Sequence, residues 1–491
     1  MLLINFSAKR QNIIFIEAIK IKKMRPLFKK YNFCLLLLVI ALFSCNKESR
    51  EIEDMDDMDM MDMVDVDTMN TTSTDTMNIV DTDTMETDVM TSTSPNILFI
   101  IADDMGKDAT AGFSEGTIKP NTPNLNSIKD AGLTFNNFWT YPTCTPTRAS
   151  IITGKYGYRT GVRSVGDILN NSETVLQQYI SEQTDDEYAT AVVGKWHLAG
   201  GDGNANPESF GIDYYAGIIS GGVQNYYRWD LSEDGESTRQ TDYTTEVLTD
   251  LAIDWVNNQT QPWFLWLAYN APHTPFHIPP AEMHSQGALP EYNDNLDGTP
   301  YYMAAIEAMD YQIGRLLENM PTDVLDNTII IFIGDNGTPG QVAQFPYARR
   351  KAKGSLYQGG VNIPLFVSGK GVNRTGVDNS LIGSTDLYST IAELAGGNSS
   401  TIHDSKSFKD LLNTTTAQRA YQYTELGDGA DSEWAISNGT YKLIRNPNGT
   451  EEMYDLADDP YENENLLNGT LTTTQENAKA ALETELAVIR N

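Results

Sequence analysis

The sequence is poor in cysteine, with three among 491 residues. Two of them, Cys34 and Cys45, lie in an N-terminal segment that has the composition of an export signal, which leaves Cys144 alone in the rest of the chain. A solitary thiol has no disulfide partner, so a fold held together by disulfides is excluded. Some other chemistry has to account for Cys144.

Basic residues are also scarce. The chain has 34 Lys and Arg against 67 Asp and Glu, a formal net charge of −33 at pH 7. A surface of this sign repels polyanions, so nucleic acid is not expected as a partner. An anionic substrate would have to be held by a few lysine, arginine and metal charges gathered inside a cleft.

Long hydrophobic runs are absent apart from one near the N-terminus. Residues 35–42 are apolar and follow basic residues, which is the pattern of a signal peptide and too short for a membrane span. The ending Leu-Phe-Ser-Cys at 42–45 resembles a bacterial lipobox, whose cysteine receives a lipid after export. We therefore expect residues 1–45 to be a leader, with Met24 as an alternative start, and Cys45 to be lipidated. The expected location is the outer membrane or cell surface, with its periplasmic side as the alternative.

From residue 51 to residue 94 the chain has no positively charged side chain. Residues 51–94 contain 14 acidic residues, no Lys or Arg, and otherwise mostly Met, Thr and Ser. Such a composition cannot bury enough apolar surface to offset the entropy of the chain. The sequence predicts a disordered acidic tether over residues 46–94.

From residue 95 onward, apolar runs alternate with helical patterns. Strands are predicted at residues 97–102, 189–193, 263–268, 329–333 and 365–367, and helices at 175–181, 243–257 and 302–317. Continuous apolar strands separated by helices indicate an α/β fold with a large, mostly parallel sheet between layers of helices. We expect a catalytic domain over residues 95–415. A smaller C-terminal subdomain, an antiparallel sheet with a terminal helix, is expected over residues 416–491.

Carboxylates follow two of the predicted strands directly. Asp103 and Asp104 come after the first strand, and Asp335 and Asn336 after the fourth. In parallel sheets the ligand crevice lies at the carboxyl ends of the strands. Four side chains with oxygen ligands suit a hard divalent cation such as Ca²⁺ or Mg²⁺. Separate loop or helix-capping acids are the alternative interpretation.

Several motifs together make the chain resemble the type I sulfatases of the alkaline phosphatase superfamily. They are Cys144-x-Pro146-x-Arg148 with Thr153-Gly154, Gly194-Lys195-Trp196-His197, Ala271-Pro272-His273-Thr274-Pro275, Asp335-Asn336-Gly337, Lys353-Gly354-x-x-Tyr357-x-Gly359-Gly360, Tyr454-Asp455-Leu456 and Asp459-Pro460-x-Glu462-Asn463. The resemblance implies an alkaline phosphatase-like fold and hydrolysis of sulfate esters. It also implies that a maturation enzyme oxidises Cys144 to formylglycine (3-oxoalanine), whose hydrate is the nucleophile.

The resemblance assigns roles to individual side chains. The implied metal ligands are Asp103, Asp104, Cys144 in its oxidised form, Asp335 and Asn336, around one Ca²⁺ per chain, with Mg²⁺ as the alternative. The implied catalytic residues are Cys144, Arg148, Lys195, His197, His273 and Lys353. Among them, the two lysines hold sulfate oxygens and Arg148 holds the hydrate. His273 protonates the leaving oxygen, and His197 takes a proton when the sulfated intermediate collapses.

Two positions depart from the family pattern. Gln358 replaces an acidic residue before the double glycine, and Asn362 replaces an arginine after it. Because both lie close in sequence to Lys353, they put the substrate contacts in question rather than the reaction.

The expected substrate is a sulfated oligo- or polysaccharide. Arg350, Tyr226 and Arg228 are predicted contacts, since aromatic faces stack on sugar rings and basic groups pair with sulfate or uronate. Among algal glycans ulvan is our specific expectation, with carrageenan, agar-type galactans and fucoidan as alternatives. Aryl sulfates and glycosaminoglycans remain open. A phosphoesterase of the same fold is disfavoured because its two-metal members need more histidine ligands, and a glycan-binding protein without activity would be expected to lose some of these polar positions.

Overall fold

The apolar runs that follow residue 95 form the centre of a ten-stranded sheet. A computed structural model describes residues 94–200, 205–398 and 402–491. The predicted leader, the lipidation at Cys45 and, except for Ser94, the tether lie outside the described residues. The described residues belong to one compact unit, which runs from Asp88 to Asn491. The predicted domain boundary between residues 415 and 416 therefore separates two sheets within a single unit.

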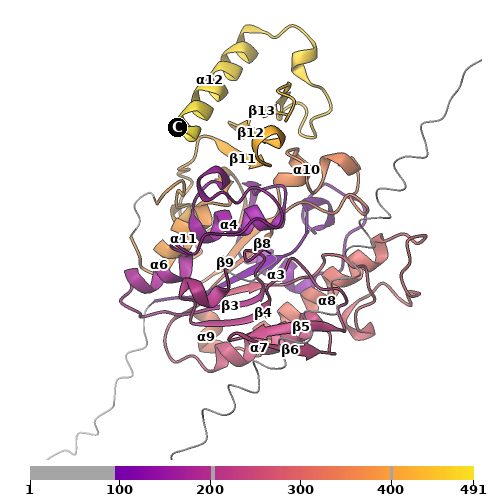
Figure 1. Cartoon of the computed structure of the whole chain (residues 1–491), viewed down its shortest axis with the longest axis vertical. Helices are drawn as coiled ribbons and strands as arrows, with labels where there is room; N and C mark the ends of the chain where they lie inside the picture. Colours follow the sequence, from indigo (N-terminus) through magenta and orange to yellow (C-terminus); the bar gives the residue numbers. More distant parts are fainter. Residues whose placement is uncertain (1–93, 201–204, 399–401) are drawn as a thin grey trace, which may run out of the picture. The chain divides into compact units, whose positions relative to one another are not determined.

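The large sheet has the strand order β10-β2-β9-β8-β1-β7-β3-β4-β5-β6 (Figure 1). Its strands are β1 (Asn96–Ala102), β2 (Leu133–Trp139), β3 (Ala189–Lys195), β4 (Tyr214–Ile218), β5 (Trp229–Glu233), β6 (Glu236–Gln240), β7 (Trp263–Ala268), β8 (Thr328–Gly334), β9 (Leu365–Gly369) and β10 (Gly376–Gly383). The pairs β1/β7, β1/β8, β3/β7, β3/β4 and β2/β10 are parallel, whereas β9 runs antiparallel to both neighbours. The predicted mostly parallel sheet is confirmed.

Both faces of the sheet are buried under helices. In β1, Ile97, Phe99 and Ile101 join one hydrophobic cluster, and the alternate residues Leu98, Ile100 and Ala102 join another. The first cluster is covered by α4 (Cys144–Thr153), α6 (Leu176–Gln183) and α11 (Asp386–Leu394), and the second by α3 (Pro123–Asp130), α7 (Thr244–Asn257) and α8 (Thr299–Glu318). Because side chains of a strand alternate between its faces, a strand that is apolar throughout requires this double cover.

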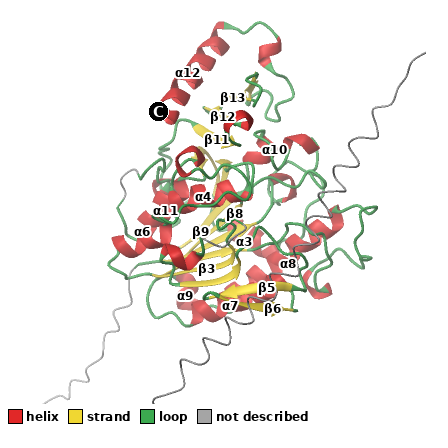
Figure 2. Cartoon of the chain, in the orientation of Figure 1, coloured by secondary structure: helices red, strands yellow, loops and turns green. Residues whose placement is uncertain are grey.

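A second sheet follows in the C-terminal region (Figure 2). The strands β11 (Gln422–Leu426), β12 (Glu433–Ser437), β13 (Tyr441–Arg445) and β14 (Glu451–Asp455) form an antiparallel meander. The terminal helix α12 (Thr473–Arg490) buries Leu482 in the cluster on one face of this meander. The other face packs Ala435, Ile444 and Tyr454 against Trp139 of β2, which ties the small sheet to the large one.

Shorter helices complete the chain. They are α5 (Gly157–Thr160), α9 (Thr322–Asp326) and α10 (Gln358–Val361), with 3-10 turns η2 (Lys107–Ala109), η3 (Pro207–Phe210), η4 (Ala281–Met283), η5 (Arg349–Lys351), η6 (Lys409–Leu412), η7 (Gly429–Asp431) and η8 (Leu466–Asn468). None of the helices among the described residues combines the length and the apolar character that a membrane span requires.

Candidate active site

The carboxyl ends of β1 and β8 bring the predicted oxygen ligands together. Ala102 and Gly334 are aligned in the parallel register, so the residues after them are neighbours. The backbone N–H of Asp104 donates to Asp335 Oδ1 at 3.0 Å, and Asn336 Nδ2 donates to Asp104 Oδ1 at 2.7 Å. Asp103, Asp104, Asp335 and Asn336 are all buried, with at most 1% of each residue exposed.

Two lysines balance two of these carboxylates. Lys195, at the end of β3, places Nζ 2.6 Å from Asp103 Oδ2. Lys353 places Nζ 2.5 and 2.6 Å from the two oxygens of Asp104. Both ammonium groups therefore lie at the cluster, in positions from which they could hold an anion.

Cys144 is the first residue of α4, and Arg148 follows one turn later. The buried Arg148 guanidinium donates to the carbonyl of Lys195 at 2.8 Å and to Asp335 Oδ2 at 2.9 Å. With this third cation, three carboxylates in the cluster face three basic side chains. The free backbone amides at the start of α4 favour negative charge beside Cys144.

Two histidines flank the cluster. His197 Nδ1 lies 3.2 Å from Cys144 Sγ, and a Cβ at Gly221 would come within 2.4 Å of His197 Nε2, so the chain passes close over the ring. His273 Nε2 lies 3.7 Å from Asp104 Oδ2. His273 Nδ1 lies 2.7 Å from the carbonyl of Thr274, which can only accept, so Nδ1 carries a hydrogen and Nε2 faces the cluster.

The cluster shifts the pKa of several groups. Burial raises the pKa of the Cys144 thiol above its ordinary value. Burial also lowers the pKa of His197 far below its ordinary value, with the charge of Lys195 acting in the same direction. Burial would raise the pKa of Asp103, but the charge of Lys195 and its basic neighbours outweighs burial and lowers it. At neutral pH the unmodified thiol and His197 are therefore both uncharged.

The donor set fits a hard divalent cation. Asp103 Oδ1 and Asn336 Oδ1 are buried without any hydrogen-bond donor, which is costly for an acceptor unless another group satisfies it. Possible ligand atoms of Asp103, Asp104 and His273 lie within 4.8 Å of one another. Both oxygens of Asp335 already accept hydrogen bonds, from Asp104 and Arg148, so its place among the ligands stays a prediction.

The predicted sugar contacts have mixed outcomes. Arg228 and Arg350 are exposed, and their contact with substrate stays a prediction. The prediction for Tyr226 was wrong, because 1% of this residue is exposed and its ring stacks on that of His277 at 3.7 Å. The Tyr226 hydroxyl donates to the carbonyls of Asn270 and His273 at 2.8 and 2.7 Å. Tyr226 therefore positions the loop that carries His273.

Sequence patterns missed two residues beside the cluster. Tyr302 on α8 donates its hydroxyl to the carbonyl of Asp104 at 2.7 Å, and Asp104 has a φ of 72°. A left-handed backbone is strained for aspartate, so this bond helps to hold it there. Asn270, just after β7, is buried, and neither of its side-chain polar atoms has a hydrogen-bond partner among the described residues. Neither role can be recognised without the tertiary contacts, although Asn270 does follow an apolar strand.

Known proteins resemble the chain in both sequence and fold. Residues 95–397 match the family model "Sulfatase", and residues 351–491 match the model "N-sulphoglucosamine sulphohydrolase, C-terminal". The chain is 29% identical over 368 residues to the uncharacterized sulfatase YdeN of Escherichia coli, covering 63% of this chain and 64% of that protein. Bovine arylsulfatase A is 26% identical over 465 residues, covering 80% and 88%. Mouse arylsulfatase J is matched over 53% of its length, so the chain spans only about half to two thirds of some curated relatives.

Solved structures of sulfatases share the architecture. Ps i-CgsB in complex with k-i-k-neocarrahexaose superposes with a TM-score of 0.67 at 25% identity, covering 76% of this chain and 89% of that one. BT4656, in complex with its substrate D-glucosamine-2-N,6-O-disulfate, gives 0.67 at 22% identity over 81% and 98%, which bears on the fold alone. The family model over the catalytic residues and the shared fold agree: the chain belongs to the sulfatase family of sulfuric ester hydrolases, within the alkaline phosphatase superfamily.

Proposed function

We propose that this protein hydrolyses sulfate esters of a sulfated glycan, with formylglycine made from Cys144 as its nucleophile. The observation that carries the proposal is the position of Cys144. It begins α4 beside His197 within a buried cluster of three carboxylates and three basic side chains. Family membership supports the reaction class.

The thiol itself is a poor candidate for the nucleophile. Its pKa is raised by burial, so little of it is thiolate at neutral pH. Conversion to an aldehyde is a two-electron oxidation in which sulfur leaves and oxygen enters, carried out by the maturation enzyme with its oxidant. One hydroxyl of the hydrated aldehyde attacks sulfur and becomes sulfated as the alcohol leaves. Loss of the proton from the second hydroxyl then re-forms the carbonyl and breaks the bond between carbon and the sulfated oxygen, which releases sulfate and regenerates the aldehyde.

The surrounding side chains have separate tasks. Arg148 neutralises charge beside the nucleophile, and Lys195 and Lys353 hold the sulfate oxygens. His197, uncharged and 3.2 Å from the Cys144 sulfur, is placed to accept a proton there. His273 turns Nε2 towards the cluster and protonates the leaving sugar oxygen. A divalent cation held by Asp103, Asp104, Asp335 and Asn336, with Ca²⁺ preferred over Mg²⁺, would lower the pKa of the attacking hydroxyl and offset the negative charge of sulfate.

The substrate class is inferred from chemistry and from relatives. Ps i-CgsB binds a carrageenan-type hexaose and BT4656 a sulfated glucosamine. A sulfated algal polysaccharide is our proposal for this chain, with ulvan as the specific candidate. We further propose that the protein is exported and anchored through a lipid on Cys45, at the outer membrane or cell surface, where it would meet such a polymer. An arylsulfatase is the second candidate, because several curated relatives carry that name.

The test is sulfate release by protein co-produced with a maturation enzyme. The assay uses 4-nitrophenyl sulfate, sulfated oligosaccharides from ulvan, carrageenan and glycosaminoglycans, and 4-nitrophenyl phosphate as the control. Release from a glycan with at most weak aryl sulfatase activity supports the proposal. Turnover of phosphate esters alone would overturn it. Mass spectrometry of the tryptic peptide that ends at Arg148 checks the modification, since aldehyde or hydrate must replace the thiol.

A further inference from the structure

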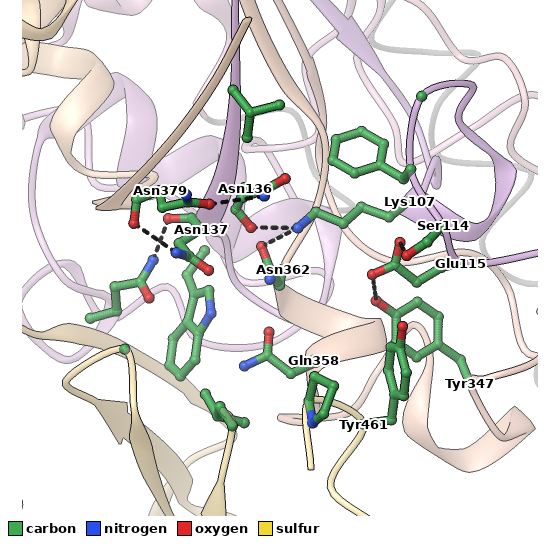
Figure 3. A pocket seen from close by; sticks show the side chains of 18 residues that line it. Lys107, Ser114, Glu115, Asn136, Asn137, Tyr347, Gln358, Asn362, Asn379 and Tyr461 are labelled. Atoms are coloured by element: carbon green, nitrogen blue, oxygen red, sulfur yellow. Dashed lines mark hydrogen bonds between the residues drawn. The ribbon is translucent and has the colours of Figure 1, made fainter. Parts of the chain in front are cut away.

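A second pocket lies between the large sheet and the C-terminal sheet (Figure 3). Its volume is about 410 Å³, within the range of small-molecule sites and enough for one or two sugar rings. Strands β2 and β10 contribute Asn136, Asn137 and Asn379, and helix α10 and the residue after it contribute Gln358 and Asn362. None of its lining residues belongs to the catalytic cluster. The two positions that depart from the family pattern therefore line this pocket.

Gln358, the first residue of α10, lines the pocket. Gln358 is 5% exposed, and its side-chain amide makes no hydrogen bond to another described residue, although its backbone N–H donates to Glu462 at 2.6 Å. Figure 3 shows this amide directed into the pocket. An amide offers two donors and one acceptor, and because the polar atoms of Gln358 are not among the buried atoms without a partner, they are open to the pocket. Gln358 is therefore placed to bind a ligand with both hydroxyl donors and acceptors.

A buried cation stands on the opposite wall. Lys107 is 3% exposed, and its Nζ donates to the carbonyl of Asn136 at 2.5 Å and to Asn362 Oδ1 at 2.9 Å. Within the described part of the chain no carboxylate pairs with it at 4.0 Å or less. Burial lowers the pKa of Lys107 to about 8, against the opposing effect of Glu115. An ammonium group has three hydrogens, so one remains for a ligand oxygen.

Aromatic and acidic groups complete the lining. Trp139 and Tyr461 line the pocket; Trp139 is 2% exposed, with Lys442 Nζ 4.7 Å from its ring, whereas Tyr461 is partly exposed and offers the more open aromatic surface. Glu115 also lines it, with Tyr347 Oη 3.5 Å from its carboxylate. Side-chain amides, one ammonium, one carboxylate and aromatic rings in a single cavity match a pyranose ring, which has many hydroxyls and an apolar face. A bare anion would meet the carboxylate of Glu115.

We propose that this pocket is an accessory site that binds one sugar ring of a glycan, separate from the catalytic cluster. Gln358 and Lys107 hold its hydroxyls, and the ring of Tyr461 packs against it. This inference rests on the proposed function, which supplies the identity of the glycan. Binding a second point of a polymer would raise the effective concentration of sulfate esters at the cluster.

Two variants test the proposal without disturbing the catalytic residues. Gln358→Met removes the amide at similar volume. Val377→Trp fills the mouth of the pocket from an exposed position on β10, 58% exposed, where folding is not at risk. Val488→Trp, at a valine on α12 that is 65% exposed, is the matched control. Binding is measured by calorimetry on protein made without the maturation enzyme, with chemically desulfated oligosaccharides of ulvan and carrageenan and, separately, with inorganic sulfate.

We expect at least one desulfated oligosaccharide to bind, with affinity about tenfold weaker in Gln358→Met and Val377→Trp and unchanged in Val488→Trp. In matured enzyme the same two variants should raise KM for the polymer several-fold and leave kcat/KM for 4-nitrophenyl sulfate unchanged. Binding of inorganic sulfate alone, or oligosaccharide binding that the variants leave intact, would overturn the accessory site while the proposed function stands. If matured enzyme hydrolyses no sulfate ester, the proposed function fails, and the calorimetry still decides the pocket.

Discussion

Two groups of buried charges in this protein differ in how completely they are satisfied. In the C-terminal region, Lys442 Nζ lies 2.6 Å from Glu462 Oε1 and 2.6 Å from the carbonyl of Leu356, and Glu462 Oε2 accepts from the backbone of Gln358 at 2.6 Å. In the catalytic cluster, Asp103 Oδ1, Asn336 Oδ1 and Arg148 Nε are buried without partners. Glu462 of the first group and Asn336 and Arg148 of the second lie in stretches that resemble sulfatase motifs.

The difference separates structure from chemistry. The Lys442–Glu462 pair holds β13 against the stretch after β14 that carries Glu462, and its ammonium group is enclosed by two acceptors and the ring of Trp139. A cluster with unsatisfied acceptors keeps a cost that a bound cation can remove. We therefore infer that Glu462 is part of the family pattern because it stabilises the fold. Asp103 and Asn336 are part of it because they take part in the reaction.

The largest expected effect is the loss of activity in Cys144→Ala. Without the side chain that becomes formylglycine, kcat/KM should fall by about 10⁴-fold or more. The free energy of unfolding should change by about 1 kcal/mol at most, because one sulfur atom is removed. Sulfate release and thermal unfolding are measured on the same preparation, and substantial activity in this variant would contradict the assigned nucleophile.

Removing one partner of the Lys442–Glu462 ion pair should have the opposite effect, a loss of stability with unchanged turnover. Lys442→Met leaves Glu462 buried and unpaired, which should lower the free energy of unfolding by about 3–5 kcal/mol. Turnover per folded molecule should be unchanged at temperatures where the variant is folded. Denaturant titration gives the stability, and the double variant Lys442→Met/Glu462→Gln should recover part of the loss, because no buried charge remains. A loss of turnover as large as the loss of stability would show that the pair acts in catalysis.

An unsatisfied acceptor in the catalytic cluster should give an intermediate effect. Asn336→Ala removes one such oxygen, so activity should fall about 100-fold while stability without metal changes little. Adding Ca²⁺ should raise the melting temperature of the wild type and have a much smaller effect on the variant. Treatment with a chelator should inactivate the wild type, with activity restored by Ca²⁺ or Mg²⁺. Equal stabilisation of both proteins by Ca²⁺ would place the metal elsewhere.

The sequence predicts the centre of the sheet better than its edge. Strands β1, β3, β7 and β8 are continuous apolar runs, and each was recognised. Strand β2 was missed because Asn136 and Asn137 interrupt its apolar run, and the edge strand β10 because a polar segment that includes Asn379 interrupts it. These polar residues line the second pocket, so the same side chains hid the strands and form the cavity.

The cluster of site residues was predictable because strand ends converge. Asp103, Lys195 and Asp335 each lie at or directly after a strand end, and the parallel register brings them together.

Burial is harder to predict for aromatic residues. Tyr226 lies in a tyrosine-rich stretch whose side chains could equally have been exposed at the surface. Only the structure shows that the ring of Tyr226 packs on His277. Tyr302 was expected on a helix, but its bond to Asp104 depends on how that helix packs.

The smallest effect should come from the cap of α12, which is not part of the catalytic cluster. The hydroxyl of Thr472 accepts from the N–H of Gln475 at 3.3 Å, and the Gln475 side chain accepts from the N–H of Thr472 at 2.9 Å. Thr472→Ala should therefore lower the free energy of unfolding by about 1 kcal/mol. Thr474→Ala, an equally exposed change within the same helix, is the control and should be neutral or slightly stabilising because alanine is the better helix former. Neither variant should alter sulfate release, since α12 packs on the small sheet through Leu482, and denaturant titration resolves the two. If the two changes had equal effects on stability, composition rather than the cap would set the stability of this helix.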